Sequence, residues 1–339
     1  MKIIKKSIPL LIFILLFTTL PARARPRERN STRALREAAV ARALAWLHTQ
    51  QQPNGAIGGL GGSCDMARVV ALAGDDPDGP SWTPEQTSLL QRCKLDLPDY
   101  LARNDTGRLA KVLRAAQAAN QNPHNFGGYD LLARLQAQYD PQTGLYAANN
   151  LFRNSLALIA LNEAQQPVPA QAIAAVLAEQ HDDGCWGWPV GGTVSDTDTS
   201  GLMLNALAGA GYGDAPQVNQ CIARLMAMQN DDGGWELSGI YGDTESNVDS
   251  TALVMQGLIA AGWDPEGPRL TQTQNATQAL LSFQAQDGAF WWRQGQAGSL
   301  LLGTQQAIQP LMMVYPNEIE KPWQLYQPVV QTRVMVIVD

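Results

Sequence analysis

Two aspartates, Asp198 and Asp249, hold matching places in the chain, and a carboxylic acid suits proton chemistry. An offset of 51 residues lays 198–207 on 249–258, so each aspartate stands at the start of an apolar stretch. Such an acid can transfer a proton to a reacting group. An aspartate at the start of a helix also caps it, by accepting a hydrogen bond from a free backbone N–H. Every helix needs a cap whereas a catalytic acid is needed once, so the repetition favours capping for both residues.

The elements that would position these aspartates recur along the chain. Five passages carry glycine, any residue and a large apolar residue, and each lies between two helical patterns: QQPNGAI (51–57), YDPQTGLY (139–146), HDDGCW (181–186), NDDGGW (230–235) and AQDGAF (285–290). A sixth, weaker passage is NDTGRL (104–109). The glycines of the six passages are 37 to 55 residues apart, which fits one pair of helices per unit.

The two helices of a unit differ in their apolar pattern. Before the fifth turn, apolar residues recur at the spacing of an amphipathic surface helix: Val218, Ile222, Leu225 and Met226. After that turn, residues 251–262 (TALVMQGLIAAG) are apolar almost all round, which indicates a buried helix. Six such pairs can close into a ring that leaves no uncapped end. The sequence therefore predicts an all-α fold, an α6/α6 double-ring toroid over residues 25–315, with an open superhelix as the competing arrangement.

The glutamine, glycine and aromatic residues of the turns resemble the Q-and-W repeat of squalene-type cyclases. The matching sets are Trp46, Gln51 and Gly55; Gln180, Gly184 and Trp186; Leu225, Gln229, Gly233 and Trp235; and Gln284, Gly288 and Phe290. From about Ala34 to Val314 the chain is similar to the α/α-toroid superfamily of terpenoid cyclases, protein prenyltransferase β subunits and transcobalamin-like carriers. It is most similar to short secreted bacterial members described as prenyltransferase-like or squalene-cyclase-like. The resemblance implies the fold, but one fold hosts many functions.

In squalene-type cyclases, the middle aspartate of an Asp-x-Asp-Asp-Thr-Ala motif protonates the substrate. Residues 247–252 (NVDSTA) match four of its six positions and place Asp249 on that acid, but Asn247 and Ser250 replace the flanking carboxylates. The matching segment 195–200 (SDTDTS) has Thr199 where the last aspartate should stand. The resemblance therefore implies, as an alternative function, a terpene cyclase or isomerase with Asp249, or less favourably Asp198, as its general acid.

Metal and thioester chemistry fit the sequence poorly. Protein prenyltransferases bind zinc through Asp-x-Cys and a distant histidine, but no histidine follows Asp183-Gly184-Cys185. The thioester of complement-type toroids needs a glutamine three residues after a cysteine, and Ala67 takes that place after Cys64. Paired carboxylates in the glycine turns lack the six or more oxygens that calcium prefers. We therefore expect no metal and no cofactor.

Aromatic side chains cluster near the turns of the last three units, which should lie at one end of the ring. Together with polar residues that begin the inner helices, they form a candidate ligand-binding rim around a central cavity. Burial in the core is the competing interpretation for each aromatic residue. The candidate rim comprises Trp186, Trp188, Asp196, Asp198, Trp235, Tyr241, Asn247, Asp249, Phe290, Trp291 and Trp292.

Both ends of the chain differ from the repeats. Residues 1–24 have the lysines, the apolar run and the small-residue site (Ala22-Arg23-Ala24) of a signal peptide, with an uncleaved anchor as the alternative. Their removal leaves 20 basic and 31 acidic residues, which argues against nucleic-acid binding. The tail, residues 316–339, contains a β-branched run at 329–338 that predicts a pairing strand or the start of a further domain. No β domain like that of the cobalamin carriers is evident, so cobalamin is not expected.

Four cysteines, Cys64, Cys93, Cys185 and Cys221, allow two disulfides in three possible pairings. The sequence as a whole predicts an extracellular or cell-surface toroid without a membrane span after signal cleavage. We expect it to bind, without converting it, an apolar or amphipathic small molecule or a surface polymer at its central cavity. A cyclase is the alternative, and a structural or adhesive module with a filled cavity is the third possibility.

Overall fold

Helices make up the regular structure of the part of the chain that the structure describes. The computed structural model describes residues 26–237 and 244–318, and those residues contain twelve α-helices and no β-strand beyond isolated bridges. The predicted strand at 329–338, the signal segment 1–24 and Tyr241 lie outside the described residues. Among the described helices, none is long and apolar enough to cross a membrane.

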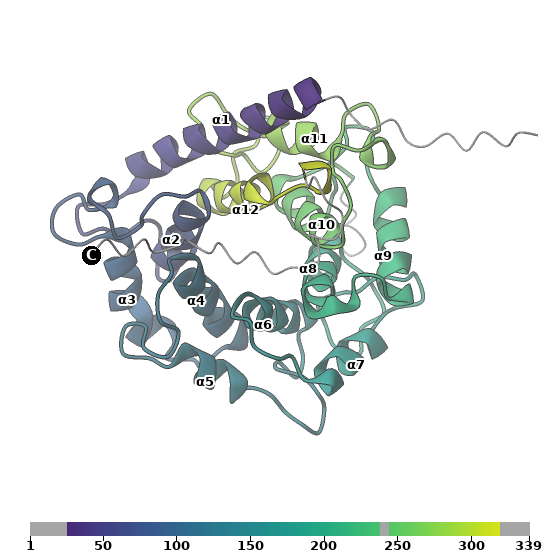
Figure 1. Ribbon diagram of the computed structural model, residues 1–339, viewed down its shortest axis with the longest axis horizontal. Coiled ribbons are helices and arrows are strands. Elements are labelled where there is room, and N and C mark those ends of the chain that lie inside the picture. The colour runs from purple at the N-terminus through teal and green to yellow at the C-terminus, as the bar shows by residue number, and fades with distance from the viewer. Residues whose placement is uncertain (1–25, 238–243, 319–339) are drawn as a thin grey trace, which may run out of the picture.

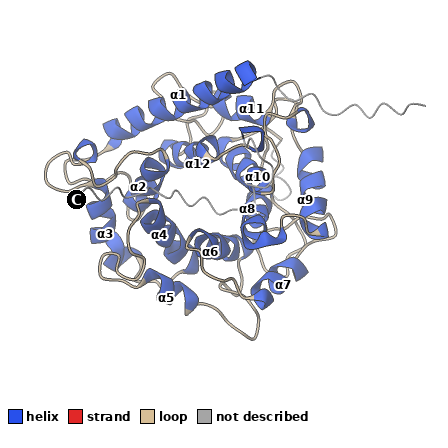
Figure 2. Ribbon diagram, viewed as in Figure 1, coloured by secondary structure: helices blue, strands red, loops and turns tan. Residues whose placement is uncertain are grey.

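The helices alternate between an outer and an inner ring (Figures 1 and 2). The outer helices are α1 (Pro26–Gln50), α3 (Leu89–Tyr100), α5 (Leu131–Gln136), α7 (Ala170–Ala178), α9 (Pro216–Ala227) and α11 (Ala276–Ser282). The inner helices are α2 (Gly62–Leu72), α4 (Thr106–Ala118), α6 (Leu151–Glu163), α8 (Thr197–Leu207), α10 (Val248–Ala260) and α12 (Leu300–Met312). Each inner helix contacts the next, and α12 contacts α2, so the ring closes. The predicted toroid fold is confirmed, and the open superhelix is wrong.

Small residues let the inner helices approach closely, as their sequence indicates. A Cβ atom added at Gly257 on α10 would collide with the backbone carbonyl of Gly201 on α8. A Cβ atom at Gly201 would in turn meet the backbone of Leu253 and Val254. Neighbouring inner helices run in the same direction, because their matching ends lie together. The Ser250 side chain at the start of α10 bonds to Asp198 at the start of α8, and Asn162 near the end of α6 donates to Ala206 near the end of α8. Their N-termini therefore gather at one end of the toroid.

Four glutamines tie neighbouring turns and helices together. The Gln229 Nε2 atom donates to the Gly233 carbonyl (2.8 Å) across its own turn and to the Leu270 carbonyl (3.0 Å) ahead of α11. Gln51, Gln180 and Gln284 bond in the same way in their own turns. The bond from Gln284 reaches Ala39 on α1 at 2.8 Å, so it joins the last turn to the first helix.

The turn predicted at NDTGRL (104–109), the weakest of the six passages, does not form. Asp105 is the N-cap of α4, because its side chain accepts from the Arg108 backbone N–H at 3.0 Å, and Gly107 therefore lies in the first helical turn. The other five turn glycines all have positive φ, which an L-residue adopts only with strain.

The cysteine pairing, which the sequence leaves open, is Cys64 with Cys93 and Cys185 with Cys221. Each disulfide joins the start of one inner segment to the outer helix that follows it. Cys64 lies on α2 and Cys93 on α3, whereas Cys185 lies in the turn before α8 and Cys221 lies on α9.

Candidate functional site

Asp198 and Asp249 do not cap their helices, so that prediction is wrong. Asp196 caps α8, with its side chain accepting from the Thr199 backbone N–H at 2.6 Å. Asn247 caps α10, with Oδ1 accepting from the Ser250 N–H at 2.9 Å. Each capping position is already occupied, so the aspartate two residues later turns its side chain elsewhere.

The side chains of Asp198 and Asp249 face a cavity on the axis of the toroid. Asp198 and Asp249 both line a space of about 210 Å³ that the side chains leave inside the inner ring. Because the inner helices run in parallel, the number of residues after each N-cap gives the depth of a side chain in this cavity, at about 1.5 Å per residue. Both aspartates stand two residues after their caps, which defines an acid end of the cavity.

Burial sets the protonation of the two acids. Desolvation raises the pKa of Asp198 to about 7; the Ser250 side chain lowers it, and the charges of Asp196 and Asp249 raise it further. Desolvation also raises the pKa of Asp249, to about 6. The other charged groups that line the cavity are Asp65, Arg68, Lys111 and Arg114, and Lys111 is already paired with Asp65 at 3.3 Å. Near neutral pH the two acids therefore exchange protons readily.

The middle of the cavity is apolar on one side and polar on the other, where Lys111 on α4 and Gln305 on α12 also stand six residues after their N-caps. Leu156 on α6, Leu202 on α8 and Leu253 on α10 each stand six residues after the N-cap of their helix, so they form a leucine layer at one depth. Phe152 and Leu302 also line the cavity, close to the acid end.

The far end of the cavity holds arginine and amide groups. Arg68 on α2 and Arg114 on α4 both donate to Glu163, the last residue of α6, at 2.8 Å and 2.9 Å, and Arg68 also donates to Gln309 on α12 at 2.6 Å. Burial raises the pKa of Glu163, but the charges and hydrogen bonds of Arg114 and Arg68 outweigh it and lower that pKa to about 2. Two cations thus face one carboxylate, and this arginine end carries a net positive charge.

Within residues 26–237 and 244–318, four buried polar atoms in the cavity wall have no hydrogen-bond partner: Asp198 Oδ1, Asp249 Oδ1, Gln256 Nε2 and Arg68 Nε. Buried polar groups in native proteins are almost always satisfied by protein, water or ligand. Arg68, Gln256 and Phe152 are not among the site residues predicted from the sequence. The available signal was a single polar residue within an otherwise apolar helix, as in VMQGLIA around Gln256.

The aromatic rim does not form as predicted. Trp186, Trp235 and Phe290 are fully buried, and the two indole N–H groups donate to the carbonyls of Val176 and Leu225, at the ends of outer helices. These aromatic side chains therefore fill the space between the outer and the inner helices. Trp188 is exposed, Trp291 and Trp292 are half-buried, and none of the three lines the axial cavity.

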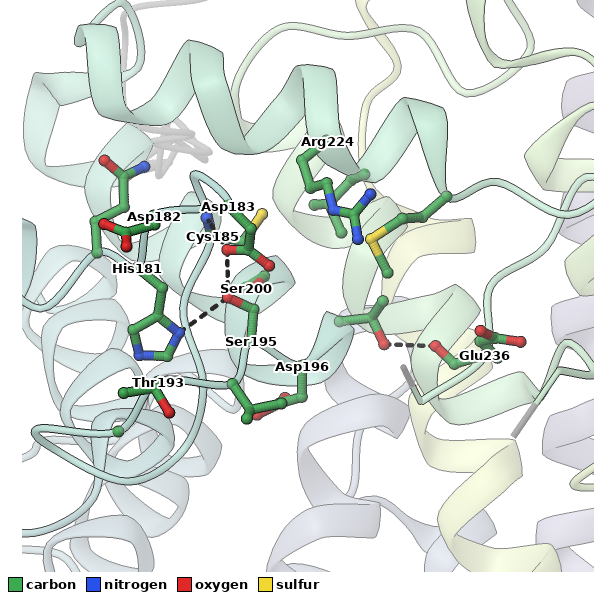
Figure 3. Close-up of a pocket in the computed structure, with 16 residues that line it drawn as sticks. His181, Asp182, Asp183, Cys185, Thr193, Ser195, Asp196, Ser200, Arg224 and Glu236 are labelled. Carbon is green, nitrogen blue, oxygen red and sulfur yellow. Dashed lines mark hydrogen bonds between the residues drawn. The ribbon is translucent and has the colours of Figure 1, made fainter. Parts of the chain in front are cut away.

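A larger groove of about 710 Å³ lies between the turn at 180–185, the loop at 192–197 and α9 (Figure 3). In it, His181 Nδ1 lies 3.0 Å from the Ser195 hydroxyl, which donates to Asp183 at 2.7 Å. A serine nucleophile needs the opposite order, with histidine between serine and aspartate.

The next unit shows that this arrangement holds the turn together. Asn230, Ser246 and Asp232 occupy the same positions there and make the same two bonds, at 2.9 Å and 2.7 Å. Because asparagine cannot act as a base, the shared geometry points to a structural role.

No group of three or more metal-ligating side chains was found among residues 26–237 and 244–318.

The comparisons with known proteins agree on the fold. The sequence matches no protein-family model and no curated protein. The structure is similar to the apo form of type II terpene cyclase MstE from Scytonema, with a TM-score of 0.58 and 12% identity over 83% of this chain and 98% of that one. The chain is an α/α toroid.

Two further structures extend the likeness beyond cyclases. A polysaccharide lyase gives a TM-score of 0.59 at 12% identity, covering 83% of this toroid and 96% of the lyase. A protein from Actinoplanes gives 0.54 at 14% identity, covering 81% and 98%. At these identities the likeness establishes the fold and leaves the activity to the site.

Proposed function

We propose that this toroid binds a small amphipathic molecule in its axial cavity and does not convert it. The observation that carries the proposal is the layered cavity wall, in which Asp198 and Asp249 each have one carboxyl oxygen without a hydrogen-bond partner among the described residues, next to the leucine layer. A polar head at the acid end and a short apolar body against the leucines would satisfy both parts of the wall. A purely apolar ligand would leave the buried oxygens unpaired, which costs free energy.

The volume of the cavity favours a small ligand over a polymer. An engineered cavity of about 150 Å³ in another protein holds benzene, and pockets for drug-sized ligands measure about 300 to 1,000 Å³. The axial cavity, at about 210 Å³, lies between these values. It therefore suits a molecule of roughly ten heavy atoms or fewer.

Cyclisation of a polyprenyl chain is the second candidate, because Asp249 holds the place of the cyclase acid and faces the cavity. A variant of MstE has been solved in complex with the substrate geranylgeranyl dihydroxybenzoate. Three features weigh against this chemistry here: the small volume, the many charged and amide side chains in the wall, and a pKa near 6 for Asp249, which makes it a weak acid. Cyclic products formed by the protein from squalene or a geranylgeranyl compound would overturn the non-catalytic proposal.

Hexylamine is a suitable first probe, since its ammonium group suits the acid end and its chain suits the leucine layer. We expect calorimetry at pH 7 to give a Kd below about 1 mM, which corresponds to about 4 kcal/mol. Leu302→Trp should abolish binding, because Leu302 lines the axial cavity and the larger side chain of tryptophan would fill it. Leu302 is 40% exposed, so it is not part of the packed core.

The matched control is Leu95→Trp, at an exposed leucine on outer helix α3. This variant should bind hexylamine as the parent does. Equal binding by both variants, or no binding by the parent, would contradict ligand capture in the axial cavity.

We also propose that the protein acts outside the cell after loss of residues 1–24. The two disulfides support this proposal, because disulfides persist mainly in oxidising compartments. N-terminal sequencing of secreted protein should begin at or near Arg25, and recovery from the cytosol with Met1 intact would refute export.

A further inference from the structure

We propose that the ligand of the axial cavity is a linear zwitterion, with a primary ammonium group between Asp198 and Asp249 and a carboxylate beside Arg68 and Gln256. This inference rests on the proposed function and specifies its ligand. It follows from the order of the three layers along the axis, from the unpaired polar atoms and from the separation of charge.

The unpaired atoms fall at the two ends of the cavity. Asp198 Oδ1 and Asp249 Oδ1 are acceptors when the acids are ionised, and they lie at the acid end. Gln256 Nε2 and Arg68 Nε are donors, and they lie nine and seven residues, respectively, after the N-caps of their helices. Gln256 is 2% exposed and Arg68 is 8% exposed, so bulk water does not satisfy them. A ligand that pairs all four atoms must donate at one end and accept at the other.

The charges have the same direction as the donors and acceptors. At the acid end, neither aspartate has a basic partner within ion-pair distance among the described residues. At the other end, Arg68 and Arg114 share the single carboxylate of Glu163. An ammonium group therefore suits the first end and a carboxylate the second, and charge-assisted hydrogen bonds are stronger than neutral ones.

The distance between the ends sets the length of the ligand. Asp249 and Gln256 are seven residues apart on α10, which is about 10 Å along the helix. The nitrogen and carboxyl carbon of 6-aminohexanoate are six single bonds apart, or about 7 Å when extended, and a hydrogen bond at each end covers the remainder. Its methylene groups would lie against the leucine layer. In 3-aminopropanoate the same groups are only about 4 Å apart, so it cannot reach both ends.

Calorimetry with a matched series tests the inference on the intact protein. We expect 6-aminohexanoate to bind about tenfold more tightly than hexylamine, since it adds charge-assisted hydrogen bonds at the arginine end. Hexanoate and 3-aminopropanoate should bind more weakly than 6-aminohexanoate by at least about tenfold. Asp249→Asn should weaken both hexylamine and 6-aminohexanoate.

The variant Gln256→Met separates the two ends, because it keeps the length of the side chain and removes the unpaired donor. It should reduce the preference for 6-aminohexanoate over hexylamine by about fivefold to tenfold, because only the zwitterion carries a carboxylate that this donor can bind. Hexylamine binding without any preference for the zwitterion would overturn this inference and leave the proposed function standing. Failure of every probe to bind would overturn both.

Discussion

Replacing Glu163 with glutamine should lower the free energy of unfolding at pH 7 by about 3 kcal/mol. Glu163 pairs with Arg68 and Arg114, whose side chains are 9% and 7% exposed, and its loss leaves two buried cations without a counter-charge. Breaking a buried pair by removing one partner costs about 3 to 5 kcal/mol, and the low end applies because the Glu163 side chain is 33% exposed. Urea unfolding followed by circular dichroism measures the change.

Glu85→Gln is the control, since Glu85 is an exposed carboxylate in a loop, and its free energy of unfolding should change by less than about 0.5 kcal/mol. The pH dependence has a definite sign. The folded pKa of Glu163 is depressed to about 2, so its contribution is present above the unfolded pKa of about 4.5 and is lost as the pH falls toward 2. An equal effect of the two substitutions at pH 7 would contradict the buried network.

Replacing Cys185 and Cys221 together with alanine should cost about 4 kcal/mol of stability. The disulfide closes a loop of 36 residues, and the chain-entropy relation gives about this value for such a loop. The Cys64–Cys93 bridge closes 29 residues, so the corresponding double variant should lose nearly as much. Denaturant unfolding under non-reducing conditions compares the three proteins.

The reductant provides the control for this pair of variants. Each double variant should lose further stability when the remaining bridge is reduced, and the parent should lose the sum of both effects. A parent that unfolds at the same denaturant concentration with and without reductant would contradict the presence of the two disulfides.

The toroid could be predicted from the repeats because the same turn residues recur from unit to unit. Gln229 and Gly233 recur as a pair in three other turns, and the structure shows that all four glutamines make the same two bonds. The prediction of a turn at Gly107 was wrong because glycine beside a polar residue is also compatible with the first turn of a capped helix. A side-chain cap at Asp105 decided between the two.

The site was harder to predict because several good capping residues stand in a row in each segment. In SDTDTS and NVDSTA, the extended cap is fixed by a distant backbone contact, since the N–H groups of Asp196 and Asn247 donate to the carbonyls of Trp186 and Trp235. Those contacts exist only in the folded chain. They place Asp198 and Asp249 two residues further on, in the cavity wall.

The cavity layers share this difficulty. An inner helix such as α10 is apolar almost all round, so its sequence does not show which of its residues face the axis. Gln256 and Leu253 could be assigned to the cavity only after the ring had closed. The rim predicted from the aromatic residues was wrong for a different reason. Large aromatic residues near a turn are equally compatible with a rim and with a core between the two layers of helices.

A carbon-13 NMR titration of the Asp198 and Asp249 carboxyl groups, with and without hexylamine, tests the axial site most directly. In the free protein the pair should titrate with apparent pKa values near 7 and 6, because burial disfavours both charges. Saturating hexylamine should lower both values, since the ammonium group stabilises the carboxylates. Two carboxyl groups that titrate near the ordinary aspartate value of about 3.9 and do not respond to the amine would contradict the account.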